Sequence, residues 1–142
     1  MFLGEYEYRV DVKGRVPLPP KYREKLKDGL VLTAGPEKCI VAYSSAEWEK
    51  LASNLTGGSI VPSKLRRLNR AVFASAYSLE ADGQGRIALP SILRNRAEIG
   101  DTAVVVGANN CIEIWNPASW NSEKPSAEEQ LWQIIESLEE QR

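Results

Sequence analysis

The feature that most constrains the fold of this chain is an internal repeat. Residues 8–19 align with residues 79–90, sharing Asp, Gly, Arg, Leu and Pro at matched positions. Both segments contain an Asp-x-x-Gly-Arg motif, at Asp11–Arg15 and at Asp82–Arg86. After a one-residue shift the match continues from Gly35 with Gly107 to Trp48 with Trp120. A duplication of this kind means that one structural unit is built twice, and it has to be recognised before any fold is assigned.

Each copy predicts the element order β-β-α-β-β. A strand with alternating apolar and charged residues (6–11 in the first copy) leads into the motif, where Asp suits the first position of a type I turn and Gly the fourth. A second strand, 15–18 or 86–89, ends at a proline, which cannot donate to a β-ladder. A short helix (21–27 or 92–97) and a second hairpin (30–34 with 39–43, or 103–106 with 111–115) complete the copy.

One such module, of roughly 45 residues, lies near the lower size limit for independent folding. We therefore expect the two modules to pack about a pseudo-two-fold axis and to share one core. The fold class is mainly β with flanking helices, that is, α+β. The expected boundaries are module 1 at 1–55, a linker with a basic helix at 56–75, module 2 at 76–122 and a C-terminal helix at 123–142.

Capping boxes mark two of the helices outside the modules. Ser44 with Glu47 precedes an apolar stripe that runs to Leu55, and Ser126 with Glu129 precedes an acidic amphipathic C-terminal segment. The pattern leaves open whether this last helix packs in the core or against a neighbouring subunit.

A third helix, opened by Pro62, carries a basic cluster. This cluster either contacts phosphate or is a solvated face that pairs with acidic neighbours. Its members are Lys64, Arg66, Arg67 and Arg70.

Composition restricts the possible chemistry. The chain has no histidine, and its two cysteines, Cys39 and Cys111, lie in apolar stretches outside any CxxC pair. This removes His-dependent nucleophiles and argues against zinc, so the cysteines are interpreted as core residues. No apolar run approaches the roughly 18–20 residues of a membrane span, and the N-terminus lacks the features of a signal peptide. We expect a cytoplasmic protein that is not an enzyme, with no cofactor, metal, membrane partner or small-molecule substrate.

The net charge of −1 conceals an asymmetry between the two halves. Residues 1–70 hold 13 Lys/Arg and 8 Asp/Glu, whereas residues 71–142 hold 5 and 11. A basic face on the first half is therefore compatible with nucleic-acid binding, although an ordinary solvated surface with an acidic tail has the same composition.

Two roles are expected for the motif residues: some form the turn, and the arginine is placed to contact nucleic acid. Turn chemistry accounts for the Asp residues, whose side chains can cap turn amides. Arg15 begins a strand among other basic residues and is placed for bidentate contacts with phosphate or guanine. Because no Gly-rich phosphate loop, helix-turn-helix or zinc-finger spacing is present, DNA would be contacted by hairpins and short loops.

The duplicated motif, together with the N-terminus and the segments that flank the motif, resembles the MraZ family, a bacterial family built of two SpoVT/AbrB-like domains. The resemblance covers the chain from Met1 to about Trp120. It implies a swapped-hairpin, AbrB-like pseudo-dimer that assembles into a ring-like homo-oligomer. It also implies a DNA-binding transcriptional regulator of the division and cell-wall gene cluster, acting on short direct repeats upstream of its own gene. The segments that carry the resemblance are Met1–Tyr6, Asp11–Arg15, Pro19–Arg23, Asp82–Ile87, Leu89–Pro90, Leu93–Arg94, Ile112–Trp115 and Trp120.

We therefore predict a nucleoid-associated protein that binds double-stranded DNA sequence-specifically. The predicted chief contacts are Arg15 and Lys13, and the predicted supporting contacts are Arg86, Arg9 and Arg23. The turn-forming residues are Asp11, Gly14, Asp82 and Gly85.

Two other functions compete with this prediction. One is an oligomeric protein-interaction scaffold in which the Asp/Arg pairs are structural. The other is a hydrolase with paired carboxylates, which is disfavoured because both recurring carboxylates are locked in turns. The second turn also lacks the lysine of the first, so the two motifs need not contribute equally.

Overall fold

The strands of the two repeats are interleaved in one antiparallel sheet. The computed structural model describes residues 1–141, and its six-stranded sheet has the order β1-β7-β8-β4-β3-β5 beside a two-stranded sheet of β2 and β6. Short apolar runs bounded by turn residues form these strands, as the sequence predicts. The strands are β1 (Glu5–Arg9), β2 (Arg15–Pro17), β3 (Leu30–Ala34), β4 (Ile40–Ser44), β5 (Tyr77–Leu79), β6 (Arg86–Ala88), β7 (Thr102–Gly107) and β8 (Ile112–Trp115).

Five α-helices accompany the strands, which confirms the α+β class. The first continues into a 3₁₀ turn at Glu24–Leu26. The helices are α1 (Pro20–Arg23), α2 (Ser45–Thr56), α3 (Pro62–Phe73), α4 (Ser91–Arg96) and α5 (Pro117–Glu140).

Each repeat lends its first strand to the other repeat. β1 pairs with β7, β5 pairs with β3, and the last strands of the two repeats, β4 and β8, meet at the centre. The second strands, β2 and β6, pair with each other. The strands on either side of a motif turn therefore do not form a local hairpin, and the swapped arrangement implied by the resemblance is confirmed. Exchange allows two modules too small for separate cores to share one.

Strand pairing also changes the alignment of the two repeats around their second hairpins. Ala34 faces Ile40, and Gly107 faces Ile112, the residue that matches Ile40. Gly107 is thus equivalent to Ala34, and its sequence match with Gly35 is wrong. A Cβ on Gly107 would lie 2.5 Å from the backbone of Phe2. The glycine is therefore required because the N-terminal segment crosses it closely.

The core lies between the six-stranded sheet and the β2–β6 ribbon. Val16 and Ile87, which face each other at the centre of that ribbon, are fully buried, as are Leu32 and Ile114 of the large sheet. Burying a side chain of this size contributes about 1.5–3 kcal/mol, so both repeats stabilise the same core. The opposite face of the sheet carries a smaller cluster that includes the buried Cys39.

Of the two helix starts predicted from capping boxes, the start of α2 is correct and the start of α5 is wrong. The Ser44 side chain accepts a hydrogen bond from the Glu47 amide at 3.2 Å, as predicted. The capping box at Ser126 is wrong, because α5 begins at Pro117, where Asn116 accepts bonds from the first-turn amides. Ser126 lies inside the helix and donates to the Ser122 carbonyl. Pro125, which lacks a backbone N–H donor, lies in the interior of α5, and the helix continues through it.

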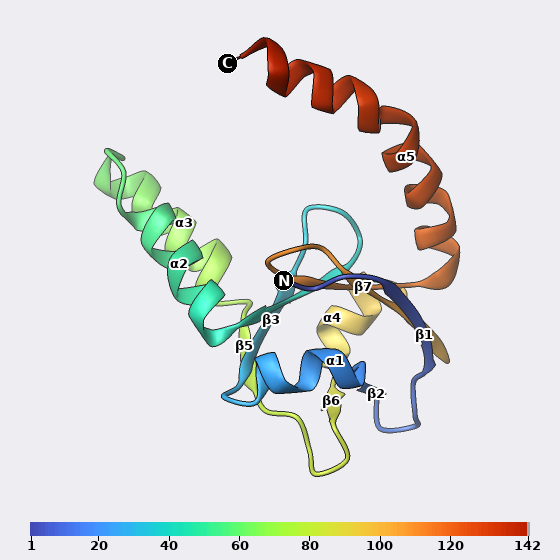
Figure 1. The fold of residues 1–142 in the computed structure, drawn as a ribbon. Helices are drawn as coiled ribbons and strands as arrows, with labels where there is room; N and C mark the ends of the chain where they lie inside the picture. Colours follow the sequence, from blue (N-terminus) through green and yellow to red (C-terminus); the bar gives the residue numbers. More distant parts are fainter. Residues whose placement is uncertain (142) are drawn as a thin grey trace.

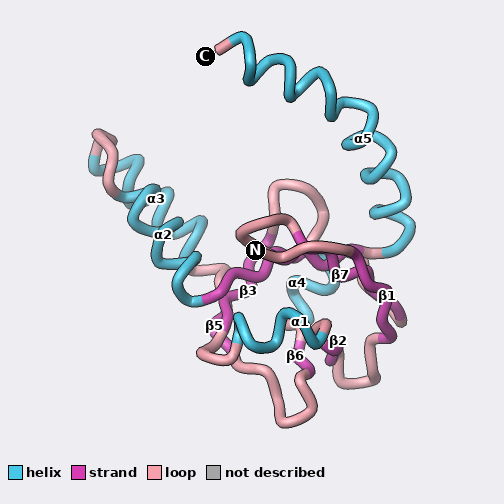
Figure 2. Tube along the Cα trace, viewed as in Figure 1, coloured by secondary structure: helices cyan, strands magenta, loops and turns pink. Residues whose placement is uncertain are grey.

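The projecting helices and the motif turns lie on opposite sides of the molecule. In Figure 1, the α2–α3 hairpin and α5 extend upward from the sheet, whereas the turn between β1 and β2 and the turn between β5 and β6 extend downward. Figure 2 shows both turns as loops that protrude beyond the sheet. Within residues 1–141, no helix has the length and apolarity needed to span a membrane.

Candidate nucleic-acid interface

The Asp-x-x-Gly-Arg motif forms the same closed turn in both repeats. Asp11 Oδ1 accepts hydrogen bonds from the amides of Lys13 at 3.0 Å and Arg15 at 2.9 Å. Asp82 Oδ1 accepts the equivalent pair at 2.9 Å each. The glycines that close the turns have φ values of 77° and 74°, a region that other residues adopt only with strain. Asp and Gly therefore shape the turn.

Each motif arginine is anchored along one edge of its guanidinium. Arg15 Nε donates to Asp11 Oδ2 at 2.6 Å, and Arg86 Nε donates to Asp82 Oδ2 at 2.9 Å. About 30% of the Arg15 side chain remains exposed. Its terminal amino groups hydrogen-bond to no residue among those described. Anchoring at Nε leaves the two terminal nitrogens, which are the donors that bidentate recognition of phosphate or guanine requires.

The acidic partners of these arginines are held in their charged form. Hydrogen bonds from the Arg15 backbone, then from its side chain and from Lys13, lower the pKa of Asp11 below its ordinary value. The Arg86 backbone bond is the largest cause of the same shift in the pKa of Asp82. Both Asp–Arg pairs are thus ionised at neutral pH.

The two anchored arginines belong to one site rather than two. In the β2–β6 pair, Arg15 faces Ala88 and Arg86 faces Pro17, so the arginines lie at the two ends of one short ribbon. Arg86 Nη1 also lies 3.9 Å from Asp11 Oδ2 of the other repeat. The two motifs consequently share electrostatic contacts across the pseudo-two-fold axis.

Two further arginines, Arg23 and Arg94, each pack against the motif turn of the opposite repeat. Arg23 Nε donates to the Leu18 carbonyl at 3.0 Å and packs over Gly85. Arg94 Nε donates to the Leu89 carbonyl at 3.1 Å and packs over Gly14. Arg23 thus has a packing contact in addition to its predicted DNA contact. Arg94 was not among the predicted site residues, although its alignment with Arg23 in the repeat was the available signal.

The other predicted basic residues surround the first turn. Lys13 is exposed beside Val12, whose side chain is fully exposed at the tip. Arg9 ends β1 opposite Thr102 and lines a hollow of about 800 Å³ with the start of the turn. The first turn therefore presents more basic groups than the second.

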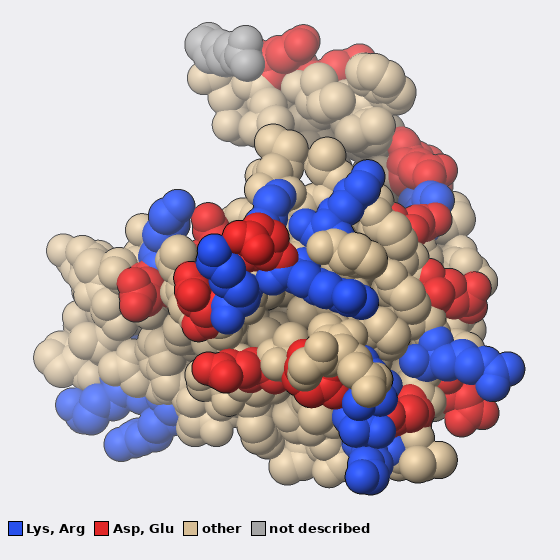
Figure 3. Space-filling model, turned by 60° about the horizontal axis from the view of Figure 1, so that its bottom comes forward, with Lys and Arg blue, Asp and Glu red and all other residues tan. Residues whose placement is uncertain are grey.

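Figure 3 shows the face that bears the turns. Lys and Arg side chains cover several parts of it, but Asp and Glu side chains lie between them. The face is therefore not a uniform basic surface, and attraction to DNA would depend on individually placed groups.

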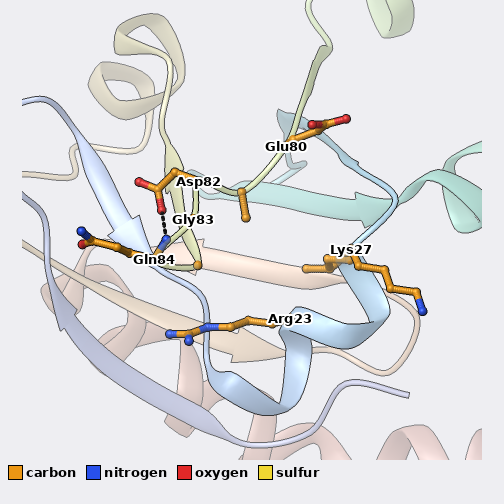
Figure 4. A pocket seen from close by; sticks show the side chains of 9 residues that line it. Arg23, Lys27, Glu80, Asp82, Gly83 and Gln84 are labelled. Atoms are coloured by element: carbon orange, nitrogen blue, oxygen red, sulfur yellow. Dashed lines mark hydrogen bonds between the residues drawn. The ribbon is translucent and has the colours of Figure 1, made fainter.

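The second turn borders a groove of about 360 Å³. Figure 4 shows Arg23 and Lys27 on the helical side of this groove and Glu80, Asp82 and Gln84 on the turn side. Small-molecule sites are predominantly apolar, so this mixed-charge lining does not resemble one.

One group of potential metal ligands lies outside the turns. Ligand atoms of Glu37, Cys39 and Glu113 are within 4.8 Å of one another. Burial raises the pKa of the Cys39 thiol to about 12, with a smaller contribution from the two carboxylates. Arg96 donates to the carbonyls of Gly35 and Glu37 in the same loop. The neighbouring guanidinium of Arg96 disfavours a bound cation at this position.

Comparisons with known proteins identify the family. A family model described as "MraZ protein, putative antitoxin-like" matches residues 1–70 and 72–137, the two repeats of the chain. The chain belongs to the MraZ family. Relatives named "Transcriptional regulator MraZ" include those of two Dehalococcoides mccartyi strains, at 53% and 52% identity, with 98–99% of each chain covered. A Roseiflexus castenholzii relative of the same name is 41% identical over 86% of this chain and 85% of its own. Since the matches span both repeats, the duplicated turn site lies within the region shared with this family.

Proposed function

We propose that this chain is a sequence-specific DNA-binding transcriptional regulator, not an enzyme, that acts as a ring-like homo-oligomer. One observation carries the proposal: two partly exposed arginines, each anchored at Nε by an aspartate, occupy the two ends of one short two-stranded ribbon. The name of its close relatives, transcriptional regulator, supports the same function.

Anchoring matters because it favours base recognition over general attraction to phosphate. A free arginine loses about 0.5–1.5 kcal/mol of side-chain entropy when it is ordered at an interface. Asp11 orders Arg15 before DNA arrives and also offsets its charge. Arg15 and Arg86 would then contact guanine edges in the major groove, while Lys13 and Arg9, with support from Arg23, would contact phosphates.

Repetition of this modest site in an oligomer would supply the affinity. Linking identical sites raises avidity by about 10²–10⁴ without new contacts, provided that the DNA carries matching repeats. The proposed targets are short direct repeats upstream of the protein's own division and cell-wall gene cluster. The proposed location is the cytoplasm, in association with the nucleoid.

A fluorescence-anisotropy titration tests this function. The full chain is titrated with DNA from upstream of its own gene and with a scrambled duplex of equal length, each at low and high salt. Tighter binding to the upstream duplex, weakening steeply with salt, is expected, because phosphate contacts release counterions. Equal binding to both duplexes would contradict sequence specificity.

The alternative is an oligomeric interaction scaffold whose Asp/Arg pairs are structural. The observation that favours it is that Asp11 and Asp82 already satisfy the Nε groups of the arginines. Under this alternative, Arg15→Ala lowers the melting temperature and disrupts assembly, with no separate loss of DNA affinity.

A further inference from the structure

The C-terminal half of α5 is an amphipathic helix with an uncovered apolar stripe. The N-terminal half is attached to the sheet, because Trp120 Nε1 and Lys124 Nζ both donate to the Glu5 carboxylate, at 2.7 and 2.9 Å. Beyond Pro125 the large apolar side chains are exposed instead. Their exposed fractions are 45% for Leu131, 68% for Trp132, 53% for Ile134 and 59% for Leu138.

An uncovered stripe of this size indicates a missing partner. Isolated helices of about 15 residues are marginal in water, and helices in proteins are stabilised mainly by packing of their apolar face. Contiguous exposed apolar surface on a soluble domain also marks an interaction site.

Charge restricts the choice of partner. Residues 126–140 contain five glutamates and no Lys or Arg. A second α5 would bring like charges together, and DNA would be repelled in the same way. The partner should therefore combine an apolar strip with basic side chains.

The α2–α3 hairpin of another copy has this combination. Residues 62–73 of α3 contain four Lys or Arg and no acidic residue. No ion pair within residues 1–141 involves these basic side chains. Ile60 and Val61, which precede the helix, are exposed, and Leu65 and Leu68 are only half-buried. Figure 1 shows α3 and α5 on the side of the sheet opposite to the motif turns.

We propose that the distal half of α5 in one copy docks along α3 of a second copy. The contact is heterologous, since each copy offers α5 to one neighbour and α3 to the other, and such contacts generate a ring when the rotation closes. The inference deepens the proposed oligomer by naming its interface, and it leaves the turns free for DNA.

A mixing experiment tests the proposal with two variants of the full chain. One variant, Arg66→Glu with Arg70→Glu, alters α3; the other, Trp132→Ala with Leu138→Ala, alters α5. Each variant alone should sediment as a monomer of 15.8 kDa, whereas the wild type should form larger assemblies. An equimolar mixture should form dimers and nothing larger, because each pair retains one intact α5 and one intact α3.

The controls separate folding and general charge effects from the interface. Circular dichroism should show unchanged helicity in both variants, as all four residues are exposed. A charge-matched control, Lys38→Glu with Lys50→Glu, alters two exposed side chains outside α3 and should assemble like the wild type. A monomeric wild type, variants that assemble normally, or a mixture that stays monomeric would each overturn the proposal.

DNA binding distinguishes this inference from the proposed function. Each variant on its own should keep salt-dependent DNA binding. Its affinity for a repeat-containing duplex should fall by about tenfold or more, because avidity is lost. If the wild type assembles through this contact yet shows no preference for the upstream duplex, the interface stands and the proposed function fails.

Discussion

Arg86 and Asp11 come from different repeats, yet Arg86 Nη1 lies 3.9 Å from Asp11 Oδ2. The same carboxylate oxygen accepts the Nε bond of Arg15 at 2.6 Å. Asp11 therefore contacts both motif arginines, and the duplicated motif acts as one electrostatic unit. The exchange of strands between the repeats places these side chains together.

This coupling predicts non-additive effects on DNA binding. In a double-mutant cycle, Arg15→Ala and Arg86→Ala should show a coupling free energy of about 0.5–1 kcal/mol, since residues in one network interact whereas distant residues add. The measurement is the dissociation constant for the upstream duplex. A control cycle of Arg15→Ala with Lys50→Ala, on α2, should be additive. Additivity in both cycles would show that the two turns act independently.

The surroundings and backbone conformation of the turn glycines predict that alanine is tolerated at one glycine and not at another. Gly14 has φ 77°, and a Cβ there would lie 2.7 Å from the Arg94 guanidinium. Gly83 has open space around its Cβ position and no positive φ. Gly14→Ala should cost about 1–3 kcal/mol of unfolding free energy, and Gly83→Ala less than about 0.5 kcal/mol. Urea denaturation measures both, and equal costs would mean that Gly14 is not held in the left-handed conformation that strains alanine.

The lowered pKa values of Asp11 and Asp82 predict an acid-sensitive turn. A carboxylate whose folded pKa is below its unfolded value stabilises the fold at pH values above the unfolded pKa, about 4. That stabilisation is lost as the pH falls through the folded pKa, which lies below 3.8. Between pH 5 and pH 2, the wild type should lose more unfolding free energy than the Asp11→Asn/Asp82→Asn variant. Parallel losses in the two proteins would exclude these carboxylates as the titrating groups.

Burial predicts that both thiols are unreactive in the folded protein. Burial raises the pKa of Cys39 to about 12 and that of Cys111 to about 11, whereas only thiolates react quickly with thiol reagents. At pH 8, labelling should require denaturant for both residues. Any slow labelling of the native protein should occur at Cys111, because Cys39 is only 1% exposed, and the Cys39→Ala variant assigns the labelled site. Rapid labelling of Cys39 in the native protein would contradict its place in the core.

Local chemistry predicted the parts of this fold that depend on neighbouring residues. The turns follow from Asp11, Gly14 and their repeats, and the start of α2 follows from Ser44, because each uses hydrogen bonds within a few residues. Partner choice among strands depends on the shared core instead. Alternation in β1 shows that it is a strand but not that it pairs with β7.

The same distinction applies to the candidate site. Motif position identified Arg15 and Arg86, but their shared contact with Asp11 exists only in the folded pair. Arg23 lies one helix after its own motif, and sequence spacing alone does not show that it packs over the glycine of the opposite turn. The start of α5 was misplaced for a similar reason, since attachment of Trp120 and Lys124 to Glu5 supports a helix through Pro125.

The most direct test of the proposed function is the affinity of Arg15 variants for the upstream duplex and for unrelated DNA, with Lys50→Ala as the control. Arg15→Ala should weaken binding to the upstream duplex by at least about 10–100-fold, the value of one bidentate base contact, and Arg15→Lys should not restore it. Binding to unrelated DNA and the sedimentation coefficient of the variant should stay close to wild type. If Arg15→Ala binds the upstream duplex as tightly as the wild type does, the anchored arginine is not the DNA-reading group.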